Sequence, residues 1–224
     1  MMNDVVLLSS AYLAPVRYYA QMLRYPHVVV EAYDHYMKQT YRNRCVIDSP
    51  TGELSLTIPV EKFEHDKCLM KDVRISDHGN WRHLHWNALV SSYRHSPFFE
   101  YYADDFRPFY EKKWTFLLDF NEELCRLVCQ LLDIPTIEAR TACYVTADEG
   151  LKVEGDVLPQ TRAFDDLRHA ITPKKVGDFD ANYTSVPYYQ VFSSRHDFLP
   201  ELSIVDLLFN MGPEGLLVLQ KSYL

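Results

Sequence analysis

The chain has 224 residues, of which 47% are hydrophobic, and it carries a formal net charge of -8. This size and composition suit one domain, residues 1–224, with its own core, and they exclude a disordered or low-complexity chain. The acidic balance also disfavours broad nucleic-acid binding, which needs a basic surface.

Other sequence features bear on compartment and metal binding. The first four residues lack the basic segment of a secretion signal, and the apolar stretch at 202–219 is interrupted by charges and a proline. The five cysteines form an odd set without a CxxC pair. This pattern favours reduced thiols over disulfides or a zinc ribbon. We therefore expect a cytoplasmic protein with no membrane span and no metal site.

The N-terminal residues predict a β-α-β unit. Residues 5–8 and 27–32 are short apolar runs, the second rich in valine, and both are typical of strands buried on two faces. Between them, Pro15 suits the start of a helix, and Pro26 ends the apolar pattern that follows. The crossover helix predicts that the two strands are adjacent and parallel.

The middle of the chain predicts a hairpin, a strand and two helices. Residues 45–47 and 54–59 flank a Ser-Pro-Thr-Gly turn, and residues 70–75 suit a further strand. A helix is expected at 81–93 with Asn80 as its cap, and Ser96 followed by Pro97 suggests another cap and first turn. Apolar residues at helical spacing predict a helix over 116–131.

The C-terminal half is less regular. Residues 142–146 suggest a strand, and most of 149–182 is polar and reads as loop. Ser203 and Asp206 have the spacing of a capping box, and Gly212 would stop the helix that they begin. Together these elements predict an α/β fold, with one mixed sheet that opens with a parallel β-α-β unit and has helices packed on it.

Two segments follow the first two strands, at the edge where open parallel sheets bind ligands. The first, residues 9–15, leads into a helix whose free N–H groups favour an anion. The second, residues 33–44, is basic and aromatic within an acidic chain. Guanidinium groups grip phosphate or carboxylate, and tyrosine stacks on rings. We predict an anionic small molecule here, a phosphate, nucleotide or sugar phosphate, contacted by Tyr12, Tyr36, Lys38, Gln39, Tyr41, Arg42, Asn43 and Arg44.

A specific arrangement follows if residues 42–44 form a strand. Arg42 and Arg44 would then share a face and grip one anion with help from Lys38, while Asn43 holds the backbone. The alternative is a solvated basic loop whose cations pair with nearby acids such as Asp34 and Glu31.

Residues 36–44, YMKQTYRNR, also resemble the signature of the WbqC-like family. Blocks in the same order at 12–15, 56–60, 85–86, 96–99 and 202–209 extend the resemblance over nearly the whole chain. The resemblance implies a bacterial protein, and it implies a relation to products of O-antigen and other surface-polysaccharide gene clusters. It supplies no catalytic mechanism and no cofactor.

Three further polar residues are candidates for a role. His85 could act as a general acid or base, or it could be a hydrogen-bonded core residue beside Trp81. His83 and His85 lie on different faces of the predicted helix, which argues against a shared metal. Gln190 lies among apolar neighbours and could serve a ligand contact or a structural network.

Two functions from different classes remain open. One is an enzyme, a transferase acting on a phosphorylated or nucleotide-linked precursor of surface polysaccharide. The other is a noncatalytic anion-binding or scaffolding protein, because the spacing reveals no pair of nucleophile and base. Convergence of Lys38, Arg42, Arg44 and His85 on one closed pocket would favour the enzyme, and dispersal would favour the binder.

Overall fold

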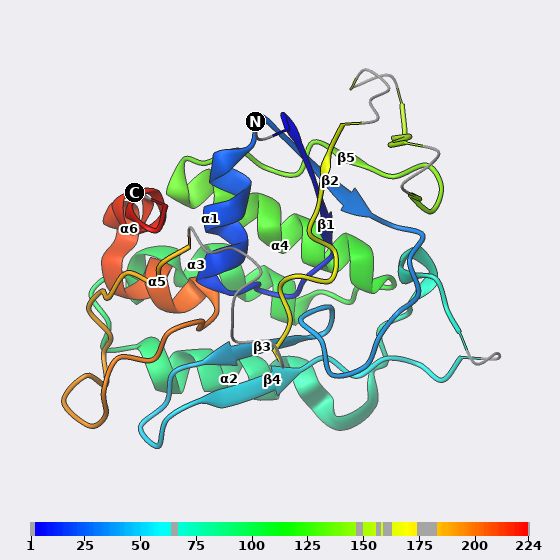
Figure 1. The fold of residues 1–224 in the computed structure, drawn as a ribbon. Coiled ribbons are helices and arrows are strands. Elements are labelled where there is room, and N and C mark those ends of the chain that lie inside the picture. The colour runs from blue at the N-terminus through cyan, green and yellow to red at the C-terminus, as the bar shows by residue number, and fades with distance from the viewer. Residues whose placement is uncertain are drawn as a thin grey trace.

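The computed structural model describes residues 3–63, 67–146, 150–155, 158, 163–173 and 183–223. Within these residues a four-stranded sheet has the order β5-β2-β1-β6, and all of its neighbouring strands are parallel (Figure 1). The strands are β1 (Val5–Ser9), β2 (His27–Glu31), β5 (Ala139–Arg140) and β6 (Asp165–Asp166). The predicted α/β class is confirmed.

The β-α-β unit is confirmed as well. Strands β1 and β2 pair in parallel, in a register that sets Ser9 beside Glu31. Helix α1 (Val16–Arg24) joins them, and Pro15 stands just before its first turn. Proline fits this position because its fixed φ suits the approach to a helix and its missing N–H costs no helical hydrogen bond.

The alternation of side chains along β1 and β2 divides the core in two. Val6 and Val28 face the main core, which also receives the buried sides of the helices. Val5 and Val29 face the other side, where a smaller cluster is closed by residues of the 139–158 stretch, among them Val145. Both faces of these strands are therefore covered, which explains their continuous apolar runs.

The predicted hairpin forms, but it does not join the parallel sheet. Strands β3 (Arg44–Ile47) and β4 (Leu54–Thr57) pair antiparallel in a sheet of their own. The outer edges of the β1–β2 pair are occupied by β5 and β6. The hairpin instead packs Cys45, Ile47 and Leu56 into the main core, so the prediction of one sheet is corrected to two.

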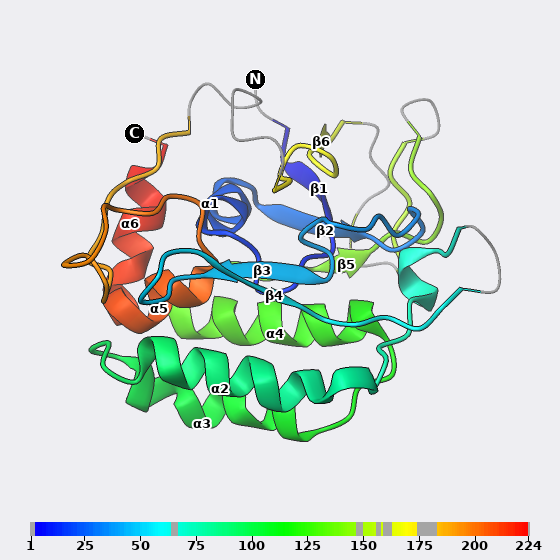
Figure 2. The same ribbon diagram turned by 90° about the horizontal axis from the view of Figure 1, so that it is seen from below.

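The remaining helices lie mostly on the side of the main core. Figure 2 shows α2 and α3 as an outer layer, with α4 between this layer and the strands. Their bounds, with those of the two C-terminal helices, are α2 (Trp81–Tyr93), α3 (Phe99–Glu111), α4 (Leu117–Leu132), α5 (Ile204–Met211) and α6 (Gly215–Lys221). Short 3₁₀ turns occupy Met70–Asp72, His78–Asn80 and Gly212–Glu214. No helix in the described part of the chain is long and apolar enough to cross a membrane.

The predicted helices at 81–93 and 116–131 are confirmed, and Gly212 ends α5 as expected. Asn80 stands before α2, but its side chain makes no capping hydrogen bond. The suggested cap at Ser96 is wrong, because Ser96 Oγ donates to the carbonyl of Tyr93 and closes α2, and α3 begins only at Phe99.

Two predicted strands are misplaced. In 70–75, Met70 and Val73 are both fully buried, and a 3₁₀ turn at Met70–Asp72 places residues three apart on one face. Only Arg74 and Ile75 form isolated antiparallel bridges, so the segment is not a strand of six residues. The strand expected at 142–146 lies earlier in the chain, as β5. After Thr141 the chain turns, and the N–H of Val145 donates to the Glu31 carboxylate instead of to a neighbouring strand.

The stretch 149–182, read from the sequence as loop, contains the short strand β6. Its residues 149, 156–157, 159–162 and 174–182 lie outside the described residues.

Candidate functional site

A narrow crevice lies at the carboxyl ends of β1 and β6. The chain runs from β1 through α1 to β2 on one side, while β6 borders β1 on the other side. Connections that leave a strand in opposite directions open such crevices in parallel sheets. The crevice has a cavity volume of about 10 Å³, which is room for one water molecule. Its lining residues are Ser9, Ser10, Ala11, Tyr18, Thr40, Tyr41, Arg42, Leu167, Arg168 and Ile171.

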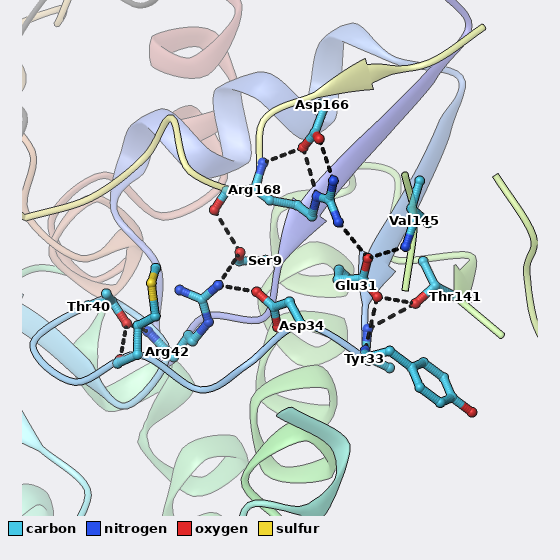
Figure 3. Close-up of polar contacts among 12 residues, drawn as sticks. Ser9, Glu31, Tyr33, Asp34, Thr40, Arg42, Thr141, Val145, Asp166 and Arg168 are labelled. Carbon is cyan, nitrogen blue, oxygen red and sulfur yellow. Dashed lines mark hydrogen bonds and ion pairs between the residues drawn. The ribbon is translucent and has the colours of Figure 1, made fainter. Parts of the chain in front are cut away.

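Arg42 is the central cation of this crevice. Its side chain is only 3% exposed, and its Nη2 donates to Ser9 Oγ at 3.0 Å and pairs with Asp34 (Figure 3). Ser9 Oγ in turn donates to the Arg168 carbonyl at 2.7 Å. The Nε of Arg42 is buried and has no hydrogen-bond partner among the described residues. Arg42 is therefore a buried guanidinium that lines the crevice, and its Nε donor has no partner among the described residues.

The backbone that carries Arg42 is held from α4. Asn121 is 1% exposed, and its Nδ2 donates to the Arg42 carbonyl at 2.8 Å and to Ser10 Oγ at 2.9 Å. On the other side, the Tyr12 N–H donates to the Tyr41 carbonyl at 2.8 Å. These contacts tie the 33–44 segment to the loop after β1.

A second charged cluster, centred on Glu31 at the end of β2, reaches the crevice through Arg168. Glu31 accepts from Arg168 Nη1 at 2.8 Å and from Thr141 Oγ1 at 2.6 Å, and it is fully buried. Arg168 also grips Asp166 through Nε and Nη2, at 2.9 and 2.6 Å (Figure 3). The cluster joins β2 to the turns after β5 and β6.

Of the residues predicted from the 33–44 segment, Tyr41 and Arg42 line the crevice. Lys38 and Gln39 are exposed, and Gln39 has a left-handed φ of 61°. Tyr36 packs edge-on against Phe63, with ring centroids 5.6 Å apart.

Asn43 and Arg44 turn to the hairpin instead. Asn43 Nδ2 donates to the Ile58 carbonyl at 2.8 Å, and Arg44 Nε donates to Thr57 Oγ1 at 3.3 Å. Strand β3 begins at Arg44, so Arg42 precedes the strand and the expected alternation of the two arginines does not apply.

Two other expectations about this edge are corrected. The first N–H of α1, at Val16, donates to the Leu202 carbonyl at 3.0 Å and is not available to a ligand. Arg42 does pair with Asp34, as the alternative interpretation has it, but the pair is buried rather than solvated, with side chains 3% and 5% exposed.

His85 and Tyr12 belong to the core. Tyr12 OH lies 3.0 Å from His85 Nδ1 and 2.9 Å from Tyr110 OH, and Tyr12 is fully buried. Burial lowers the pKa of His85 to about 4, so this histidine is neutral near pH 7. Neither residue lines the crevice.

Gln190 and Asp206 form a separate buried network. Asp206 accepts from Tyr93 OH at 2.9 Å, Tyr188 OH at 2.8 Å and Gln190 Nε2 at 3.2 Å. Gln190 also exchanges hydrogen bonds with the Leu199 backbone, so its amide is part of a structural network, and it does not line the crevice. The capping-box prediction is wrong for Asp206, although Ser203 does cap α5.

Several crevice residues are not among those predicted from the sequence, and the polar ones are Ser9, Ser10, Thr40 and Arg168. The first three lie in the two segments expected at this edge, and Arg168 lies in the stretch that reads as loop. A two-residue strand such as β6 has no periodicity to detect. An Asp-x-Arg pattern at Asp166 and Arg168 was the available signal.

Among the residues that the structure describes, no group of three or more His, Cys, Asp or Glu side chains could hold a metal ion. The five cysteines carry free thiols.

Comparison with known proteins places the chain in a family. The model of the WbqC-like protein family matches residues 10–217. The chain is 28% identical over 225 residues to a protein described as "Uncharacterized protein Rv1507c" from Mycobacterium tuberculosis (strain ATCC 25618 / H37Rv), covering 96% of each chain. No solved structure matches the chain. The family match covers every crevice residue except Ser9 and nearly all of the described fold, and the chain therefore belongs to the WbqC-like protein family.

Proposed function

We propose that this protein binds an anionic small molecule, through a phosphate or carboxylate group, in the crevice at Arg42. The observation that carries the proposal is the buried guanidinium of Arg42, which lines the crevice and whose Nε has no partner among the described residues. A buried donor without a partner is costly, and an oxyanion would satisfy it with a charge-assisted hydrogen bond.

The surroundings of Arg42 suit the same class of ligand. The polar residues Ser9, Ser10 and Thr40 line the crevice, and Tyr41 adds an aromatic side chain. The cavity has room for about one water molecule, so the walls of the crevice must open for a phosphate or carboxylate group to enter. A terminal phosphate fits this picture better than a large ring, which would lie at the mouth beside Tyr41.

Conservative replacement of Arg42 tests the site. A thermal-shift screen with inorganic phosphate, nucleoside monophosphates and sugar nucleotides selects the probe. We expect Arg42→Lys to weaken its binding at least tenfold by calorimetry, because an ammonium keeps the charge but loses the planar array of donors.

Arg44→Lys is the matched control. Arg44 is an arginine of the same segment that bonds Thr57 outside the crevice, so its replacement should leave affinity within about twofold. Equal affinity of wild type and Arg42→Lys would contradict the anion site.

A transferase acting on a phosphorylated or nucleotide-linked precursor of surface polysaccharide (O-antigen) is the second candidate. The resemblance to the family supports it, and so does the crevice at the switch point of a parallel sheet. The dispersal of Lys38, Arg44 and His85 away from the crevice instead favours binding without catalysis. Release of free nucleotide from a sugar nucleotide, with the sugar recovered on an added acceptor and both abolished by Arg42→Lys, would support the transferase. Absence of this transfer with retained binding would leave the binder.

A further inference from the structure

The charges around the crevice are unfavourable for a bare anion. Arg42 is paired with Asp34, and Arg168 faces both Glu31 and Asp166. Two arginines thus meet three carboxylates, which leaves one negative charge in excess before any ligand arrives. An anion on Arg42 would add to this excess in a partly dehydrated place, where like charges repel strongly.

Asp34 offers a way to remove the excess charge. Its side chain is 5% exposed, and its Oδ2 holds Arg42 while its Oδ1 is buried without a hydrogen-bond partner among the described residues. A proton on Oδ1 would leave the contact between Oδ2 and Arg42 in place. The carboxyl group can therefore become neutral without losing its position.

The groups around Asp34 shift its pKa in opposite directions. Burial raises the pKa of Asp34 above its usual value, Arg42 opposes this, Glu31 adds to it, and His169 opposes it weakly. A ligand anion on Arg42 would partly neutralise the charge by which Arg42 lowers the pKa of Asp34. The anion would also be a second negative neighbour besides Glu31, so it would raise the pKa of Asp34 further.

We infer that the crevice binds its anion together with one proton, which Asp34 takes up from solvent at its unpartnered Oδ1. The bound state then contains the Arg42 cation, the ligand anion and a neutral carboxylic acid. This inference rests on the proposed function, since it specifies how the same site is regulated. Binding tightens as the pH falls, and the site releases its anion as the pH rises.

Calorimetry with sulfate tests the inference, because sulfate does not titrate near neutral pH and any proton must come from the protein or buffer. We expect uptake of up to one proton per sulfate, seen as a dependence of the binding heat on the ionisation enthalpy of the buffer. Affinity should rise as the pH is lowered, by up to tenfold for each pH unit.

Two variants assign the proton. Asp34→Asn should bind sulfate with little dependence on pH, at least as tightly as wild type, because its neutral amide mimics the protonated acid. His169→Gln removes the exposed neighbouring histidine and should keep the wild-type slope. If Asp34→Asn does not fold, the buffer dependence of the wild-type protein still decides whether a proton is taken up, and the slope of His169→Gln decides whether His169 takes it.

The outcomes separate the two proposals. Sulfate binding that depends on Arg42 but takes up no proton would overturn the inference and leave the anion site intact. No sulfate binding dependent on Arg42 would overturn both.

Discussion

Replacing Glu31 by glutamine is expected to lower the free energy of unfolding by about 3–5 kcal/mol. Glu31 is fully buried and holds Arg168 Nη1 at 2.8 Å, and it also accepts from the Tyr33 and Val145 N–H groups and from Thr141 Oγ1. The amide removes the negative charge and one acceptor, so Arg168 is left with Asp166 as its carboxylate. Loss of one partner from a buried ion pair costs more than the pair contributes.

Glu123→Gln is the matched control for this change. Glu123 pairs with Arg126 one turn along the surface of α4, where both side chains are 48% exposed. Exposed pairs of this kind contribute less than about 1 kcal/mol. Urea unfolding of both variants should separate them clearly, and similar free-energy losses would show that the Glu31 cluster is not a major support of the sheet.

The second large effect concerns pH, because two buried groups respond to it in opposite ways. Burial raises the pKa of Asp206 from 3.8 to about 7, and the nearby Asp48 adds to this rise, while hydrogen bonds from Tyr188 and Tyr93 oppose it. The folded protein therefore holds a proton that the unfolded chain has lost. The stability from this site is present at acid pH and declines as the pH rises from about 4 to 7, by up to about 4 kcal/mol.

His85 works against Asp206 over much of the same range. Its pKa falls from 6.5 to about 4 through burial, so the unfolded chain binds a proton that the folded protein excludes. The stability from this site is present above about pH 6.5 and is lost as the pH falls toward 4, by about 3 kcal/mol. The two contributions largely cancel between about pH 4 and 6.5.

Single variants should reveal these opposed slopes. Relative to wild type, Asp206→Asn should gain stability as the pH rises, and His85→Gln should gain stability as the pH falls. Urea unfolding at several values between about pH 4.5 and 7.5 measures both differences. Profiles parallel to that of wild type would show that neither group changes its proton binding on folding.

Much of the fold could be predicted from local sequence. The helices at 81–93 and 116–131 and the parallel unit built on 5–8 and 27–32 are where the sequence indicates them. Periodicity is a local signal, and each of these segments presents one or two apolar faces that only one kind of element can bury. The failures, at 70–75 and 142–146, are short segments whose shape depends on distant partners.

The candidate site shows the same division. Topology from the sequence brought residues 9–15 and 33–44 to one edge of the sheet, because parallel strands end on the same side. It did not separate Arg42 from Arg44, two arginines two residues apart with different partners.

Residue type and spacing by themselves determined that cations would stand at this edge of the sheet. Only the tertiary structure decided that Arg42 is buried against Asp34 and that Arg168, which follows the two-residue strand β6, lies beside the same crevice. The physical reason is that the environment of a charged side chain depends on desolvation and on carboxylates brought from elsewhere in the chain. Sequence periodicity carries information about neither.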